Sequence, residues 1–254
     1  LHLHEWDQHA SAESNLLRLA MSAGGILLED ASGILREELP ETGGYAKILA
    51  AIGCGRSRYS EIAGLAEQRV DQPLDVLTRT AFVRRAVPVG APKAATPLYE
   101  LADVYLAFWF GVLYSEIPQI EAGQGRQVLK RVQPRIETHL GRVFEQAARD
   151  HACRLVDKDQ LPSDLVVGRW WSSRGPSCEV DVLGLLGSRS YLLGEAKWQS
   201  QPLANRDLEA LRRKVTYVPK PVDEPVYALW GRGGADPEVK RSGALVFSLE
   251  AMLD

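Results

Sequence analysis

Two acids and a lysine fall on two consecutive stretches of the chain that have the alternating pattern of β-strands. Residues 179–186 read EVDVLGLL and carry Asp181, and residues 190–198 read SYLLGEAKW and carry Glu195 and Lys197. The three residues between them include a glycine, which is typical of a hairpin loop. Such a hairpin would bring the three charged side chains to one face of a sheet, because alternate residues of a strand point to the same side.

A loop over residues 187–189 also predicts which residues of the hairpin lie opposite each other. The expected pairs are Leu186 with Ser190, Leu183 with Leu193, Asp181 with Glu195, and Glu179 with Lys197. Directly opposed residues have Cβ atoms about 4.5–5.5 Å apart, so two carboxylates in these positions repel each other. A divalent cation would relieve the repulsion, and hard oxygen ligands favour Mg²⁺ or Mn²⁺. Lys197, on the same side, can stabilise a developing negative charge or orient a water molecule.

A third acid lies on a helix predicted over residues 137–152, ahead of the hairpin. The apolar side of this helix is formed by Leu140, Val143, Phe144, Ala147, Ala148 and Ala152, at helical spacing. Glu145 lies at the edge of that stripe. It either pairs with Arg149 one turn later, a contact worth about 0.3–0.5 kcal/mol, or directs its carboxylate across the helix–sheet boundary.

The segments after the hairpin predict a small mixed sheet flanked by helices. Residues 203–217 form an amphipathic helix with a basic run at 212–214, and residues 226–230 and 245–249 are apolar strands. The basic run is either a solvated helix end or a phosphate contact.

Three short helices and a hairpin are predicted over residues 44–101, an order typical of a winged helix-turn-helix. The first helix runs from Tyr45 to a stop at Gly53, Ser60 caps the second, and Asp71 caps the third. Strands over residues 82–89 and 98–101 would flank a loop at 90–97. The buried sides of the second and third helices are expected to be Ile62, Ala63 and Leu65, and Leu74, Leu77 and Ala81.

A winged helix can place its third helix in a major groove and its wing on a phosphate backbone. The candidate DNA contacts are Arg69, Gln72, Arg79, Arg84 and Arg85. Asp71 and Asp75 would repel phosphate, so a role as a protein–protein spacer is the alternative reading.

The remaining segments are predicted to be helical. Residues 11–39 read as two helices, broken at 23–25, with the second over 29–39 and ended by Pro40. Residues 103–115 form an intensely apolar, buried helix, and a basic connector helix follows. The expected domains are a helical lead-in (1–41), a winged helix-turn-helix (42–115), a connector (116–135) and a final α/β domain (136–254).

The final domain resembles the PD-(D/E)xK nuclease superfamily, which has the restriction-endonuclease-like fold. That superfamily has an acid on a leading helix, an Asp on one strand and Glu-x-Lys on the next, matched here by Glu145, Asp181 and residues 195–197. Val180 stands where the superfamily often has a proline.

A longer resemblance covers most of the chain. The chain is similar to the C-terminal portion of archaeal-type ATPases, AAA-like proteins in which a winged helix precedes a nuclease-like domain. The matching motifs are LREEL (35–39), YELADVYLAFWF (99–110), GRVFE (141–145), VGRWW (167–171), EVDVLG (179–184) and LGEAKW (193–198). The fold class implied is α+β: N-terminal helices and a winged helix-turn-helix, then a restriction-endonuclease-like α/β domain with a mixed sheet.

The resemblance implies metal-assisted hydrolysis of phosphodiester bonds, with DNA as the expected partner. Asp181 and Glu195 would bind the metal, joined by the carbonyl of Ala196. Lys197 would stabilise the charge of the transition state, and Glu145 would bind a second metal or position water. The alternative is a catalytically silent DNA- or protein-binding regulatory module.

The chain contains no phosphate-binding GxxxxGK[ST] motif, so the resemblance places an ATPase module upstream in the same polypeptide. The first residue is Leu1 rather than Met, as expected for the tail of a longer protein.

Composition excludes several other classes of protein. The 254 residues carry a formal net charge of −3 and are 45% hydrophobic, which is ordinary for a globular chain with a core. No apolar run reaches the roughly 18–20 residues of a membrane span. Three widely spaced cysteines argue against a disulfide framework and a zinc ribbon, and a reducing cytoplasm is the expected location.

Overall fold

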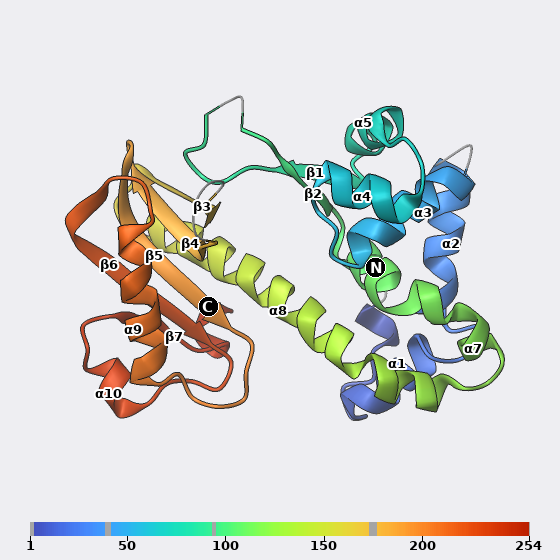
Figure 1. The fold of residues 1–254 in the computed structure, drawn as a ribbon. Helices are drawn as coiled ribbons and strands as arrows, with labels where there is room; N and C mark the ends of the chain where they lie inside the picture. The colour runs from blue at the N-terminus through green and yellow to red at the C-terminus, as the bar shows by residue number, and fades with distance from the viewer. Residues whose placement is uncertain (1–2, 39–41, 93–94, 173–176, 254) are drawn as a thin grey trace. The chain divides into compact units, whose positions relative to one another are not determined.

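The protein is α+β, and its computed structural model describes residues 3–38, 42–92, 95–172 and 177–253. The chain divides into two compact units (Figure 1). The first contains residues 1–86 and 97–139, and the second contains residues 87–96 and 140–254. The second unit thus includes the loop over residues 87–96, which the predicted boundaries assigned to the winged helix.

The first unit begins with two helices separated by a glycine break. A short 3₁₀ turn η1 (Leu3–Glu5) precedes α1 (Ala12–Leu19) and α2 (Ile26–Glu38). Ser11 caps α1, with its Oγ accepting the N–H of Ser14. The break at 23–25 is as predicted, but α2 starts three residues earlier than the predicted helix at 29. The predicted stop at Pro40 lies outside the described residues.

Three helices and a hairpin follow in the predicted order. They are α3 (Thr42–Gly53), α4 (Tyr59–Ala66), α5 (Asp71–Arg79), β1 (Val83–Ala86) and β2 (Leu98–Leu101). The two strands pair antiparallel, with Arg84 opposite Glu100. Buried Ile62, Leu74 and Leu77 join α4 and α5 to the core of this unit, as predicted.

Two predicted caps and two predicted core residues in this region are wrong. Residue 58, not Ser60, is the N-cap of α4, where Glu61 accepts the N–H groups of Ser57 and Arg58. Asp71 is the first residue inside α5 and makes no side-chain cap. Leu65 is half exposed because it falls between the buried positions 62 and 66, and Ala81 lies beyond the end of α5 with a positive φ of 59°.

The aromatic segment is not one regular helix. It consists of α6 (Val104–Phe108), a π-helical turn η2 (Trp109–Leu113) and a 3₁₀ turn η3 (Tyr114–Glu116), followed by α7 (Ile117–Glu121). Trp109 and Phe110 are fully buried, as expected of this segment. Gly53 permits the close approach of α3, since a Cβ there would lie 2.7 Å from that of Phe110.

The predicted connector and the predicted helix over 137–152 form one continuous helix with no break between them. This helix, α8, spans Gly125–Asp157 and continues through Pro134 (Figure 1). A proline removes only the one backbone hydrogen bond that its missing N–H would donate to the carbonyl four residues earlier, so the helix continues. The carbonyl of Pro134 also accepts the hydroxyl of Thr138. Residues up to His139 belong to the first unit and the rest to the second.

The second unit is built on a mixed sheet, as predicted, and this sheet has five strands. Its strands are β3 (Leu165–Trp171), β4 (Glu179–Leu186), β5 (Arg189–Lys197), β6 (Pro221–Gly231) and β7 (Leu245–Phe247). They lie side by side in that order; β3–β4–β5 are antiparallel and β5–β6–β7 are parallel. The other elements are α9 (Asn205–Arg213), η4 (Lys214–Thr216), α10 (Pro237–Lys240) and η5 (Glu250–Met252). Strand β3 was not predicted from the sequence.

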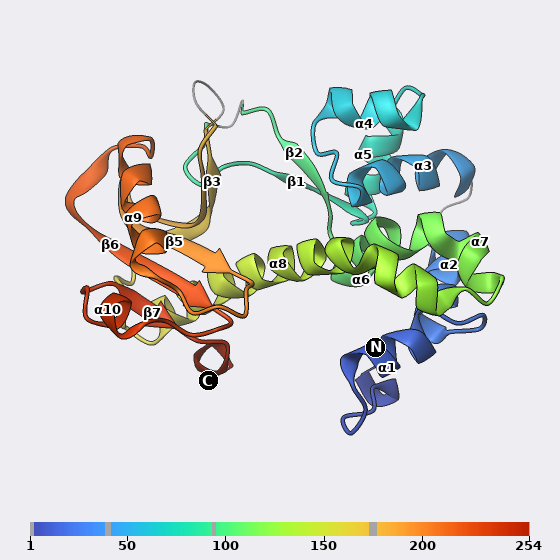
Figure 2. The same ribbon diagram turned by 60° about the horizontal axis from the view of Figure 1, so that its bottom comes forward.

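Helices cover both faces of this sheet, with the end of α8 on one face and α9 on the other (Figures 1 and 2). The α8 face packs Phe144 and Ala148 against Val182, Leu192 and Trp230. The other core is formed by Val180, Leu183, Leu193, Leu208, Leu211 and Leu229. Burial of these two apolar layers fixes the order and register of the central strands.

Of the four predicted pairs in the hairpin between β4 and β5, the structure confirms only Leu183 with Leu193. The register ends at Val182 with Gly194, so the predicted pairs Asp181 with Glu195 and Glu179 with Lys197 do not form. The hairpin loop has two residues rather than three, so Leu186 faces Arg189 and not Ser190. An irregularity after Gly184 then shifts the pairing by one residue. The shift restores the predicted pairing of Leu183 with Leu193, because the extra residue in β5 is absorbed as a bulge.

The loop over residues 87–96 packs against the edge strand β3. The N–H of Val89 donates to the carbonyl of Arg169 at 2.9 Å, and Val89 lies over Gly168, where a Cβ would come within 2.9 Å of it. Residues 93–94, in the predicted wing, lie outside the described residues. Among the described helices, none is long and apolar enough to cross a membrane.

Candidate metal and phosphodiester site

The strands β4 and β5 separate where the two predicted acids lie. The last regular pair is Val182 with Gly194. Beyond it, the N–H of Ala196 donates to Oδ2 of Asp181 at 2.9 Å. A carboxylate oxygen, rather than a backbone carbonyl of β4, therefore accepts the Ala196 N–H. The backbones of the two strands are not paired at this point.

The same hydrogen bond determines where the carbonyl of Ala196 points. The N–H and C=O of one strand residue are directed to the same side of the strand. The Ala196 carbonyl is therefore on the side of Asp181, whereas the Lys197 carbonyl faces the other way and accepts the N–H of Arg232. The Asp181 carboxylate and the Ala196 carbonyl are thus directed into one region.

Glu195 lies between two lysine side chains. Its Oε1 contacts Nζ of Lys197 at 2.9 Å, and its Oε2 accepts from Nζ of Lys214 in η4. The Glu195 side chain is only 12% exposed, so both of its oxygens are paired with cations in a largely buried setting. Burial lowers the pKa of Lys197, but the hydrogen bond and charge of Glu195, together with Asp181, raise it above the ordinary value.

Asp181 is the less compensated acid of the pair. It is 9% exposed, and burial raises its pKa to about 7, with the charges of Glu195 and Glu145 acting in the same direction. The Ala196 N–H and the charge of Lys214 oppose this rise. Among the described residues, Oδ1 of Asp181 has no hydrogen-bond or ion-pair partner.

The guanidinium of Arg149, the alternative partner of Glu145, donates to Gln146 and to the backbone carbonyl of Asp181, the latter at 3.0 Å. Burial raises the pKa of Glu145; the positive charge of Arg169 opposes this shift, the charge of Glu179 adds to it, and the positive charge of Arg149 also opposes it. The α8 helix therefore brings Glu145 within electrostatic range of Asp181, while Arg149 holds the Asp181 backbone.

Three residues at this site were not predicted from the sequence: Arg149, Lys214 and Arg169. Arg169 forms an ion pair with Glu179 and lies over the ring of Trp171. The Arg232 guanidinium, directly after β6, lies 4.5 Å from the ring centroid of Trp198, directly after β5. The one available signal for Lys214 was the basic run at 212–214, which is also compatible with a solvated helix end.

The donor set at this edge suits a hard divalent cation. In the part of the chain that the structure describes, no three His, Cys, Asp or Glu side chains form a metal-binding group by themselves. Asp181 and Glu195 would therefore act with the Ala196 carbonyl and with solvent, a set of oxygens that Mg²⁺ and Mn²⁺ accept. The unpartnered Oδ1 of Asp181 and the raised pKa of this carboxyl fit a bound divalent cation, because the cation would offset a buried negative charge.

The five predicted DNA contacts all lie in the first unit, but carboxylates accompany most of the arginines. Arg84 pairs with Glu100 at 3.0 Å, Arg79 with Asp75 at 3.2 Å, and Arg69 with Asp71 at 3.8 Å. Arg85 and Gln72 are exposed. These ion pairs reduce the positive charge of the surface that α5 and β1 would offer to phosphate.

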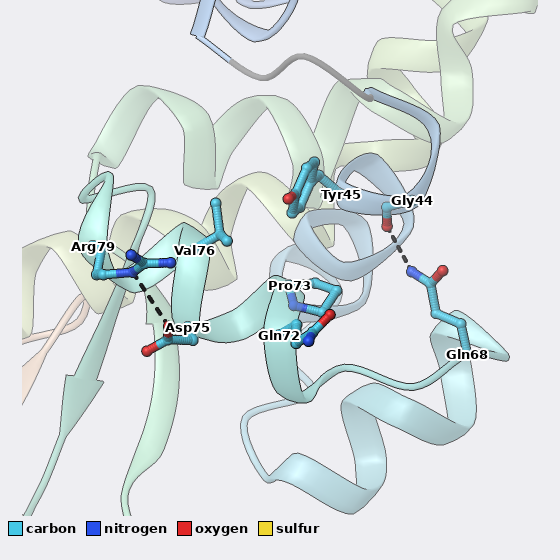
Figure 3. A pocket seen from close by; sticks show the side chains of 8 residues that line it. All are labelled: Gly44, Tyr45, Gln68, Gln72, Pro73, Asp75, Val76 and Arg79. Carbon is cyan, nitrogen blue, oxygen red and sulfur yellow. Dashed lines mark hydrogen bonds and ion pairs between the residues drawn. The ribbon is translucent and has the colours of Figure 1, made fainter.

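A pocket of about 530 Å³ lies beside α5 (Figure 3). It is lined by Gly44, Tyr45, Gln68, Gln72, Pro73, Asp75, Val76 and Arg79. Figure 3 shows the Arg79 side chain paired with Asp75 and the Gln68 amide donating to the Gly44 carbonyl at 2.6 Å. Its polar groups are thus largely engaged with one another.

Comparisons with known proteins match a part of the chain that includes Glu145, Asp181, Glu195 and Lys197. Residues 109–211 match the family model DUF234, described as "Archaea bacterial proteins of unknown function". The chain is 29% identical over 228 residues to the uncharacterized protein MJECL04 of Methanocaldococcus jannaschii, which covers 85% of this chain and 50% of that protein. The chain therefore spans about half the length of this curated relative. No solved structure matches it.

Proposed function

We propose that the second unit is a divalent-metal-dependent phosphodiesterase of the nuclease type, with a restriction-endonuclease-like fold. The observation that carries this proposal is the arrangement at the divergent ends of β4 and β5. There a buried and only partly compensated Asp181 lies near a second acid, Glu195, and beside Ala196, and Lys197 is held next to Glu195. Two acids, one backbone oxygen and one lysine at the ends of two neighbouring strands can bind a catalytic cation and stabilise the transition state of phosphodiester hydrolysis.

Each residue contributes a definable action in this proposal. A bound Mg²⁺ or Mn²⁺ would polarise the phosphodiester and lower the pKa of an attacking water. Asp181 and Glu195 hold the cation with the Ala196 carbonyl. Lys197, fixed by its contact with Glu195, provides positive charge for the additional negative charge of the transition state. Glu145 is available to hold water or a second cation.

The first unit is proposed to be a winged helix-turn-helix that binds DNA. The helices α3, α4 and α5 and the β1–β2 hairpin support this proposal through their order and lengths. With Arg69, Arg79 and Arg84 paired to carboxylates, the exposed Arg85 and Gln72 are its strongest candidate contacts. DNA bound here would supply substrate to the second unit.

An ATP-binding module in the same polypeptide is also part of the proposal. The resemblance to archaeal-type ATPases motivates it, and the relative MJECL04 is about twice as long as the region matched here. This chain carries no GxxxxGK[ST] motif, so it would bind no ATP by that motif.

A cleavage assay tests the proposed activity. The full chain with Mn²⁺ is expected to nick supercoiled plasmid, and Asp181→Asn and Lys197→Met are each expected to abolish nicking. Lys240→Met is the matched control, because Lys240 is an exposed lysine of the same unit on α10. Equal nicking by wild type and Asp181→Asn would contradict the assignment. Metal binding without any cleavage would favour the silent regulatory module instead.

A further inference from the structure

Lys214 pairs with the carboxylate oxygen of Glu195 that Lys197 does not contact. Its Nζ pairs with Oε2 of Glu195, while Lys197 pairs with Oε1. The Lys214 side chain is 24% exposed, so its ammonium group lies at the boundary between the buried acid and solvent. Its positive charge also reaches Asp181, whose pKa it lowers.

With both acids ionised, the two acids and two lysines of this cluster sum to zero charge, but both lysines pair with Glu195 and neither pairs with Asp181. Ionised Asp181 and Glu195 carry two negative charges, and Lys197 and Lys214 carry two positive charges. A divalent cation entering the site would meet both Glu195 oxygens already paired, so it competes with at least one lysine. Lys197 belongs to the same strand as Glu195, two residues away, and its position follows from the register of β5.

Lys214 reaches Glu195 from a separate element, so its contact, unlike that of Lys197, does not follow from the register of β5. It begins η4, a single 3₁₀ turn after α9, and Glu195 is its one described ion-pair partner. A lysine head group on four methylenes can swing several ångströms without a change in the backbone. When the cation binds, the cluster acquires an excess of positive charge, which favours an anionic ligand nearby.

We propose that Lys214 is a positioning residue with two states. In the metal-free protein it pairs with Glu195 in place of the cation; when metal binds, it releases Glu195 and contacts a non-bridging oxygen of the substrate phosphate. This inference rests on the proposed function, because it requires the metal at Glu195. No covalent step involves Lys214, whose action is the exchange of one ionic contact for another.

Metal affinity and turnover should respond in opposite directions to loss of Lys214. Calorimetric titration of the full chain with Mn²⁺ at fixed ionic strength is expected to show at least about tenfold tighter binding to Lys214→Met, because one opposing charge has been removed. At saturating Mn²⁺, kcat/KM for plasmid nicking is expected to fall at least about tenfold. Lys214→Arg keeps the charge and should restore both values toward wild type.

Lys240→Met again controls for the loss of one positive charge elsewhere in the unit. Unchanged or weaker Mn²⁺ binding by Lys214→Met would overturn the counter-ion role. Tighter binding with undiminished nicking would overturn the phosphate contact. Wild type that binds no Mn²⁺ would refute the proposed function and this inference together, whereas wild type that binds and nicks while Lys214→Met behaves identically would refute this inference alone.

Discussion

Replacing Asp181 with Asn should stabilise the metal-free protein at neutral and alkaline pH. The ordinary aspartate pKa of 3.8 rises to about 7 in the folded state, mainly through burial. Between these two values the folded state retains a proton that the unfolded state releases. Stability is therefore lost as pH rises through this window, which is the sign expected for an acid with a raised folded pKa.

The size of the effect follows from the same two values. Each pH unit inside the window costs about 1.4 kcal/mol, so the wild type should lose about 2.5 kcal/mol of unfolding free energy, relative to Asp181→Asn, between pH 5 and pH 8. The Asn side chain keeps an oxygen that can accept the Ala196 N–H, so this hydrogen bond is not what changes.

Urea denaturation in a chelator, repeated from pH 5 to pH 8, measures this difference. Four of the six tryptophans lie in the second unit, so their fluorescence reports mainly on the unit that contains Asp181. Asp164→Asn is the control, because Asp164 is an exposed aspartate of the same unit. Parallel curves for wild type and Asp181→Asn would refute the view that Asp181 is a costly, only partly compensated buried acid.

Three further predictions test other parts of the structure. Arg85→Ala should weaken salt-sensitive DNA binding more than Arg84→Ala, whose guanidinium already pairs with a carboxylate; equal losses in a titration against salt would contradict this. Gly194→Ala should destabilise the protein by about 1–3 kcal/mol, because a Cβ there would come within 2.9 Å of neighbouring side chains, while Gly141→Ala on open helix surface should stabilise it by up to about 1 kcal/mol. Glu116→Gln should cost about 1–2 kcal/mol at pH 7 in urea denaturation, since two arginines lose their buried partner. That difference should begin to shrink as pH falls past the ordinary value of 4.5 and disappear only below the folded-state pKa of Glu116, which the two arginines lower against the effect of burial.

The sequence was sufficient to bring the acids together because the strand pattern is strong. Alternation over 179–186 and 190–198 and the E-x-K spacing placed Asp181, Glu195 and Lys197 at one point, and the structure brings them there. The loop was predicted one residue too long, and a bulge in β5 compensates for it. Bulges depend on packing across strands, so a single sequence carries little signal for them.

Other parts of the site depend on contacts between distant segments. Arg149 reaches the backbone of Asp181 from a helix 32 residues earlier, and Lys214 reaches Glu195 from 19 residues later. Within its own helical segment, each of these basic residues looks like an ordinary solvent-exposed charge, so the local sequence does not point to the contact. The sequence also predicted a connector and a separate helix over 137–152, whereas α8 runs through both without a break.

Diffraction from crystals soaked in Mn²⁺ would show whether a divalent cation binds between Asp181 and Glu195. Anomalous scattering locates manganese independently of any assumption about activity. We expect a peak between the carboxylates of Asp181 and Glu195, next to the Ala196 carbonyl, and no peak there in crystals of Asp181→Asn. A map of the wild type with manganese bound elsewhere, or with no peak between these two carboxylates, would contradict the proposed metal site.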